Sequence, residues 1–118
     1  MAEPIDSWEK AVAFALGLPD TELSTSYGKP AVKVASNGRA FLFGREQENS
    51  LGVGIDLDSV EILKETDPDT FWQSPHYEGW PAVLIRFDSR DPERVREMIE
   101  RSHAWTRAMK PPRSRKRK

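Results

Sequence analysis

Residues 31–44, AVKVASNGRAFLFG, place two short apolar patterns on either side of an Asn-Gly pair. In the first pattern, Val32 and Val34 alternate with a lysine, as they would in a half-buried strand. Asn37-Gly38 readily supplies the positive φ angles of a type I′ turn, which predicts that AFLFG returns antiparallel to the first strand. A hairpin in the middle of the chain restricts the fold more than any other sequence feature.

Strand patterns continue on both sides of this hairpin. Residues 51–57, LGVGIDL, and residues 82–88, AVLIRFD, alternate apolar side chains with other residue types, and residues 22–27 show a weaker pattern. Several strand patterns around one hairpin are typical of an antiparallel sheet. Gly52 and Gly54 leave one face of their strand bare, so we expect another segment to pack closely there.

Three helices are predicted, at about residues 6–17, 59–65 and 91–109. Asp6 and Asp58 each precede a glutamate by three residues, which is the spacing of a capping box. Asp91 is followed by a proline, which suits the first helical position. Together with the strands, these helices predict an α+β fold of two layers, an antiparallel sheet with helices packed on one face.

Charge divides the chain into two parts. Residues 1–109 hold 12 Lys and Arg against 19 Asp and Glu, a net charge of −7, whereas residues 110–118, KPPRSRKRK, hold six cations and no acid. We therefore expect a single domain over residues 1–109 and a disordered basic tail over residues 110–118. Because an acidic body repels polyanions, contact with nucleic acid would have to come from a local patch or from the tail.

Several classes of protein are excluded or disfavoured. The chain has no cysteine, which excludes disulfides, thiolate zinc sites and a cysteine nucleophile. Residues 11–18, AVAFALGL, are too short for a membrane span and follow acidic rather than basic residues, which argues against a signal peptide. We therefore expect a cytoplasmic protein that does not associate with membranes.

No catalytic group emerges from the sequence. The two histidines, His76 and His103, lack the spacing of metal ligands, and Ser24–Ser26 lack a nucleophile-elbow pattern. The GVG of residues 52–54 lacks the third glycine of a dinucleotide motif and lies inside a strand pattern. These observations predict a protein that is not an enzyme and uses no cofactor or metal.

A nucleic-acid site is the leading interpretation. It needs rings on which bases stack and cations that contact phosphates. Residues 74–88, SPHYEGWPAVLIRFD, gather three rings just before a strand, and cations lie near the strands and in the tail. The candidate residues are Tyr27, Lys29, Arg39, His76, Tyr77, Trp80, Arg86, Arg113, Arg115, Lys116, Arg117 and Lys118. The plainer alternative is that the rings are packed and the cations merely solvate a strand face.

Two segments resemble the paired motifs of the MmcQ/YjbR family of small bacterial proteins. They are residues 24–34, STSYGKPAVKV, and residues 75–88, PHYEGWPAVLIRFD, and further similarity extends to about Met109. The matching positions are Tyr27, Gly28, Pro30, His76, Tyr77, Gly79, Trp80 and Pro81. Some family members carry an asparagine and a basic residue where this chain has Glu78 and Gly79.

The resemblance implies a compact α+β domain, an antiparallel sheet with helices packed on it, related in outline to secretion-chaperone-like folds. It also implies a DNA-binding label, with no catalytic residues to transfer. We therefore predict a monomer or weak dimer that binds DNA or another nucleic acid. In this hypothesis the two motifs form one side of a shallow groove, His76 stays accessible, and Arg39, Arg86 and the tail contact phosphates.

Two alternatives remain open. A protein- or peptide-interaction module, of chaperone or adaptor type, is favoured by the acidic body and by Glu78. A small-molecule pocket between the sheet and the loop is the other alternative, and a ligand would then raise the melting temperature. All three interpretations need the two motifs to meet in space at a surface that water can reach.

Overall fold

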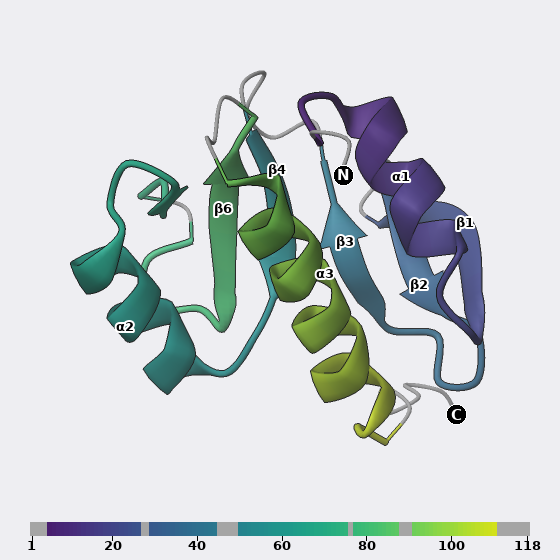
Figure 1. Cartoon of the computed structure of the whole chain (residues 1–118). Helices are drawn as coiled ribbons and strands as arrows, with labels where there is room; N and C mark the ends of the chain where they lie inside the picture. Colours follow the sequence, from purple (N-terminus) through teal and green to yellow (C-terminus); the bar gives the residue numbers. More distant parts are fainter. Residues whose placement is uncertain (1–4, 27–28, 45–49, 76, 88–90, 111–118) are drawn as a thin grey trace.

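The computed structural model describes residues 5–26, 29–44, 50–75, 77–87 and 91–110, and within them six strands form one antiparallel sheet (Figure 1). Along the sheet the order is β1-β2-β3-β4-β6-β5. The strands are β1 (Thr21–Ser26), β2 (Lys29–Val34), β3 (Ala40–Phe43), β4 (Ser50–Gly54), β5 (Phe71–Trp72) and β6 (Ala82–Arg86). The predicted strands are confirmed, including the weak one, and only the two-residue β5 has no counterpart among them.

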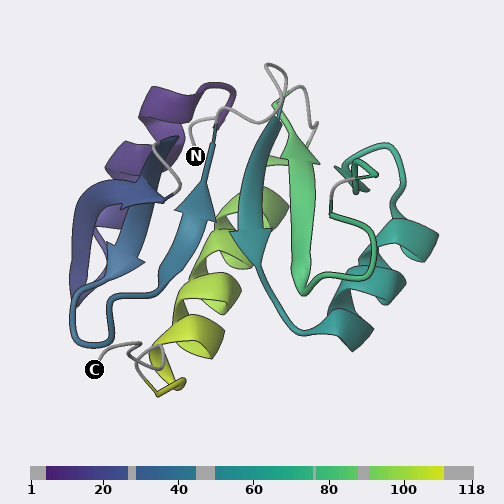
Figure 2. The same ribbon diagram turned by 180° about the vertical axis from the view of Figure 1, so that it is seen from behind.

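Three helices accompany the sheet: α1 (Trp8–Leu16), α2 (Leu57–Thr66) and α3 (Pro92–Arg107). Helices α1 and α3 cover one face, α2 lies beside β6, and none of the three described helices covers the opposite face (Figures 1 and 2). One continuous core lies between the helices and the sheet. The α+β prediction is confirmed. None of the described helices combines the length and the apolar character needed to cross a bilayer.

The helix starts are only partly as predicted. Asp91 caps α3, because its Oδ1 accepts a hydrogen bond from the Arg94 N–H at 3.1 Å. The other two caps differ: Ser7 rather than Asp6 caps α1, and Asp56 rather than Asp58 caps α2. A capping-box spacing recurs wherever acids are frequent, so it locates a helix start only to within a residue or two.

Asp56 makes the stability of the fold dependent on pH. Its two carboxylate oxygens accept hydrogen bonds from the backbone N–H and the hydroxyl of Ser59, at 3.0 and 2.9 Å. The bond from the backbone N–H, followed by the one from the hydroxyl, holds the pKa of Asp56 below its usual value. The carboxylate therefore stabilises the fold fully above the unfolded-state pKa of about 3.9, and this stabilisation is lost as the pH falls through the lower folded-state pKa.

We expect the Asp56→Ala variant to lose about 0.5–2 kcal/mol of unfolding free energy at neutral pH, with the loss shrinking toward zero as the acid is titrated. Urea unfolding of both proteins between neutral pH and about pH 3 measures the difference. Asp56→Asn is the control, since an amide oxygen still caps the helix but does not titrate in this range. A loss of unfolding free energy that is independent of pH would contradict the conclusion that the ionised Asp56 carboxylate stabilises the helix.

A β-bulge in β3 decides which side chains face the helices. Val32 pairs with Leu42 and Lys33 with Ala40, so Phe41 is an extra residue. Phe41 and Leu42 are both fully buried in the core, whereas Ala40 and Phe43 line the helix-free side. A bulged residue leaves the ladder locally unpaired, and the Ser102 hydroxyl of α3 donates to the Phe41 carbonyl at 2.8 Å.

The turn between β2 and β3 is not the predicted type I′ turn. It spans five residues, 35–39, and of its residues only Gly38 has a positive φ, at 72°. The Gly38 N–H donates to the Val34 carbonyl at 2.8 Å, which closes the turn. Asn37 is instead buried and bonded to α3. A tertiary contact of the asparagine side chain has overridden the local turn preference.

The sheet consists of two halves that meet over a short distance. Among the described residues, β4 pairs with β6 at five positions but with β3 at two, Leu42 with Val53 and Phe43 with Gly52. Beyond those pairs β3 and β4 diverge, and the C-terminal half of α3 lies behind the opening between them (Figure 2). This divergence creates the space in which the candidate site lies.

Candidate binding pocket

A pocket with a volume of about 450 Å³ lies where β3 and β4 diverge. This volume is in the range of small-ligand sites, about 300–1,000 Å³. Its rim contains exposed residues, so the pocket is open to water. It is lined by Lys29, Lys33, Gly38, Arg39, Ala40, Phe43, Gly44, Gly54, Tyr77, Trp80, Pro81, Ala82, Trp105, Thr106 and Met109. Both motifs of the sequence analysis therefore contribute to one hollow.

One wall of the pocket is cationic. Lys29 and Lys33 extend from β2 and Arg39 from the following turn, and no Asp or Glu is among the described lining residues. Two acids lie outside the lining: Glu22 pairs with Lys33 across β1 and β2, and Glu78 is exposed in the loop. An acidic body thus carries a local concentration of positive charge, which attracts anions over a short range.

The opposite wall is the loop between β5 and β6, and Gln73 holds it in place. The Gln73 Nε2 amide donates to the carbonyls of Tyr77, Trp80 and Ala82 at 3.0, 3.1 and 2.7 Å. Its Oε1 in turn accepts from Lys64 Nζ of α2 at 2.9 Å. A single side chain therefore fixes the part of the loop that lines the pocket, and no sequence pattern marked it.

Two rings of this wall differ in exposure. Tyr77 is half-buried and stacks on Phe43 of β3, with ring centroids 6.1 Å apart and an interplanar angle of 27°. A Cβ at Gly52 would lie 2.6 Å from the Phe43 ring, so the bare glycine makes room for this stack. Trp80 is 62% exposed at the rim. Since large rings are buried on average, an exposed tryptophan beside a hollow is typical of a binding surface.

The floor of the pocket comes from Trp105 and Thr106 at the C-terminal end of α3 and from Met109 just beyond it. Thr106 is buried, and among the described residues its Oγ1 hydroxyl has no hydrogen-bond partner. Buried hydroxyls without a partner are rare, because each one costs desolvation energy. Beside it, a Cβ at Gly54 would lie 3.5 Å from the Trp105 ring, which is ordinary contact. Gly54 is therefore not required by the packing and leaves space.

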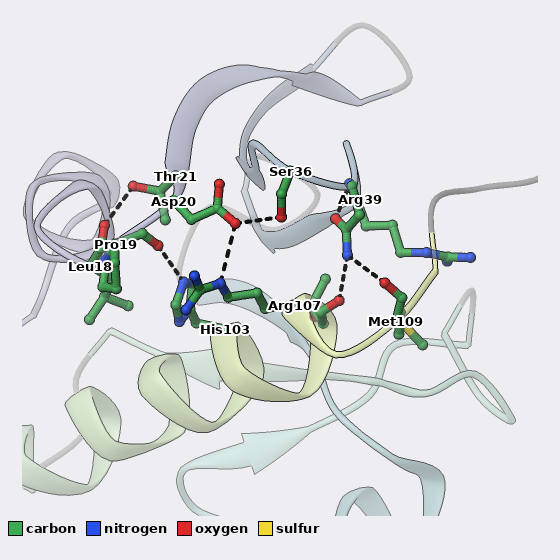
Figure 3. Close-up of polar contacts among 11 residues, drawn as sticks. Leu18, Pro19, Asp20, Thr21, Ser36, Arg39, His103, Arg107 and Met109 are labelled. Atoms are coloured by element: carbon green, nitrogen blue, oxygen red, sulfur yellow. Dashed lines mark hydrogen bonds and ion pairs between the residues drawn. The ribbon is translucent and has the colours of Figure 1, made fainter.

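Polar contacts hold this floor against the turn (Figure 3). Asn37 Nδ2 donates to the carbonyls of Thr106 and Met109 at 2.8 and 3.0 Å, and its Oδ1 accepts from the Arg39 N–H at 3.0 Å. Arg39 Nε donates to the Lys110 carbonyl at 2.6 Å. The end of α3 and the cationic wall are therefore fixed to each other through one buried amide and one guanidinium.

A second set of contacts ties α3 to the segment before β1 (Figure 3). Asp20, with φ at 64°, accepts hydrogen bonds from Ser36 and from Arg107, the latter at 3.2 Å. The hydrogen bond from Ser36 holds the pKa of Asp20 below its usual value, with Arg107 adding to the effect. His103 is buried, and its Nε2–H donates to the Pro19 carbonyl at 2.7 Å. This hydrogen bond joins α3 to the segment before β1.

The structure brings together four of the predicted site residues: Lys29, Arg39, Tyr77 and Trp80. Arg86 does not belong to this group. It pairs with Ser50 at the far end of β6 from Ala82, and its guanidinium carbon lies 4.9 Å from the centroid of the Trp72 ring. Tyr27, His76 and the tail cations Arg113, Arg115, Lys116, Arg117 and Lys118 lie outside the described residues.

Sequence reasoning missed the floor of the pocket. Trp105, Thr106 and Met109 are not among the predicted site residues, and the helix predicted over residues 91–109 gave no reason to place them at a pocket. Within the described ranges, no three His, Asp or Glu side chains lie close enough to hold a metal ion. The arrangement as described can bind a ligand that has both an anionic part and a flat apolar part.

An antiparallel sheet with helices on one face and an open ring-and-cation pocket on the other defines the architecture of this protein. A family model described as YjbR matches residues 16–105. The chain belongs to the YjbR family. No curated protein matches it. It is similar in fold to the crystal structure of Deinococcus radiodurans protein DR2400, described with the domain DUF419, at 16% identity and a TM-score of 0.73 over 87% of this chain and 80% of that one.

Proposed function

We propose that this protein binds nucleic acid through the pocket between β3 and β4. The observation that carries the proposal is the composition of the walls: three cations and no described carboxylate on one side, and the rings of Tyr77 and Trp80 on the other. Phosphates bind the cations of such a site, and bases stack on its rings. Although the body has a net charge of −7, this pocket offers a polyanion three lining cations and no described lining carboxylate.

The test is fluorescence anisotropy with labelled single-stranded and double-stranded DNA at low salt. We expect binding at micromolar protein, and we expect the combined variant Lys29→Gln, Lys33→Gln and Arg39→Gln to weaken it strongly. Each phosphate contact on a single strand contributes about −0.7 to the slope of log affinity against log salt. Losing three contacts should therefore make the slope about 2 units less steep.

The matched control changes three other cations: Lys10 of α1, and Arg94 and Arg101 of α3. It alters the net charge equally but lies outside the lining, so affinity should change little. A truncation that removes residues 111–118 separates the pocket from the tail. No binding by the intact protein would end the proposal, and binding that disappears only in the truncation would assign it to the tail.

A protein- or peptide-interaction module is the second candidate, and β1 favours it. β1 is an edge strand of six residues, it has only one charged side chain, Glu22, and its Leu23 is exposed. Such an edge can accept an added strand from a partner. Peptide binding that Leu23→Lys abolishes while DNA binding is absent would support this candidate over the first.

A further inference from the structure

We propose that the pocket receives one unpaired nucleotide of a single-stranded nucleic acid, and that the Thr106 hydroxyl forms a hydrogen bond with the edge of its base. This inference rests on the proposed function and makes it specific. In this arrangement Lys29, Lys33 and Arg39 contact the adjoining phosphates, and the base enters between the loop and the floor.

The unpartnered hydroxyl is the first support. Thr106 Oγ1 is buried at the floor, without a partner in the described part of the chain. Every nucleobase presents donors and acceptors along its edge, so an inserted base can supply the missing bond. The hydroxyl can act as donor or acceptor by rotating, which lets it pair with more than one base. An apolar ligand would leave the desolvation cost of this group uncompensated.

The separation of charge and rings is the second support. All three lining cations come from β2 and the turn after it, whereas Tyr77 and Trp80 lie on the loop between β5 and β6. A ligand that spans the pocket therefore has its anionic part at one wall and a flat apolar part at the other. A nucleotide has this division, because its phosphate and its base lie on opposite sides of the sugar.

The space at the floor is the third support. Gly54 of β4 and Ala40 of β3 both line the pocket with little or no side chain. A Cβ at Gly54 would make only ordinary contact with Trp105, so the packing does not require a glycine at this position. These two positions keep the hollow open for a ring.

These features favour a single strand over a duplex. In a duplex the bases are stacked and paired, and their faces cannot contact the rings of a protein unless one base is extruded at a cost of a few kcal/mol. A single strand presents its bases without that cost. We therefore expect the protein to prefer single-stranded to double-stranded DNA at equal salt.

The experiment compares three labelled ligands with the full chain: a 12-nucleotide single strand, the same length of strand made of abasic nucleotides, and a blunt duplex. Anisotropy at low salt should show the intact strand bound at least about fivefold more tightly than the abasic strand, since stacking of a base contributes about 1–3 kcal/mol. Equal affinity for the intact and abasic strands overturns the inference but leaves phosphate-mediated binding in place. No binding of any strand overturns the proposed function itself.

The variant Thr106→Val separates a ligand role from a structural one. Replacing an unpartnered buried hydroxyl with a methyl group should keep or raise the melting temperature while weakening the intact strand about two- to tenfold, and the abasic strand should bind as before. A variant that weakens both strands equally overturns the role of the hydroxyl. Ala40→Leu, which fills the hollow, should weaken only the intact strand. Free thymidine monophosphate bound as tightly as the strand would identify a small-molecule site instead.

Discussion

Replacement of Phe41 by alanine is expected to lower the free energy of unfolding by about 3–5 kcal/mol. Phe41 is fully buried, and its ring contacts the His103 ring edge-on, with centroids 5.2 Å apart and an interplanar angle of 71°. Phe41 lies at the β-bulge of β3, where its carbonyl accepts a hydrogen bond from Ser102 of α3. Removal of its ring therefore leaves a cavity between the sheet and the helix that contributes to the pocket floor. Urea unfolding monitored by circular dichroism measures the change.

Phe43→Ala is the matched control, because it removes the same side chain from the same strand. Phe43 lies two residues from Phe41, and a regular strand would place both on one face. The bulge instead leaves Phe43 half-buried on the helix-free side. We expect a clearly smaller loss of stability, accompanied by weaker binding of single-stranded DNA. Equal losses of unfolding free energy for the two variants would contradict the conclusion that the bulge turns Phe41 and Phe43 to opposite sides of the sheet.

Asn37→Ala is expected to cost about 2–3 kcal/mol, a large effect for a turn residue. The amide satisfies two carbonyls at the end of α3 and one backbone N–H of the turn, and the side chain is buried. In the alanine variant, the two carbonyls and the backbone N–H lose these hydrogen bonds at a buried position that water reaches poorly. Thermal and urea unfolding report the loss, and binding should weaken as well because the floor is no longer tied to Arg39.

Asn37→Asp separates hydrogen bonding from shape. The substitution keeps the size of the side chain and one acceptor, but it replaces two donors with a negative charge that faces helix C-terminal carbonyls. We expect it to be at least as destabilising as the alanine variant at neutral pH. Ala35→Ser in the same turn is the control, since Ala35 is exposed. A near-neutral Asn37→Asp variant would show that the contact to α3 contributes little.

Much of the fold was predictable because its determinants are local. Alternation along β2, β4 and β6 and the apolar repeat of α3 indicate which faces are buried, and these patterns do not depend on distant residues. The bulge at Phe41 and the turn at Asn37 were not predictable. Both depend on bonds to α3, about 60 to 70 residues away along the chain, from Ser102 and to the Thr106 carbonyl. The role of Gln73 in supporting the loop was not predictable either, because it depends on hydrogen bonds to other residues that no sequence pattern indicates.

The sequence by itself determined the class of fold, the burial of the strands and the separation of an acidic body from a basic tail. It also indicated the two motifs that contribute residues to the candidate binding site. Only the tertiary structure decided that Lys29, Arg39, Tyr77 and Trp80 share one hollow, that Arg86 lies apart, and that Thr106 is at its floor. The physical reason is that burial follows from the periodicity of neighbouring residues. A pocket depends on where strands diverge, and that is set by contacts between segments far apart in the chain.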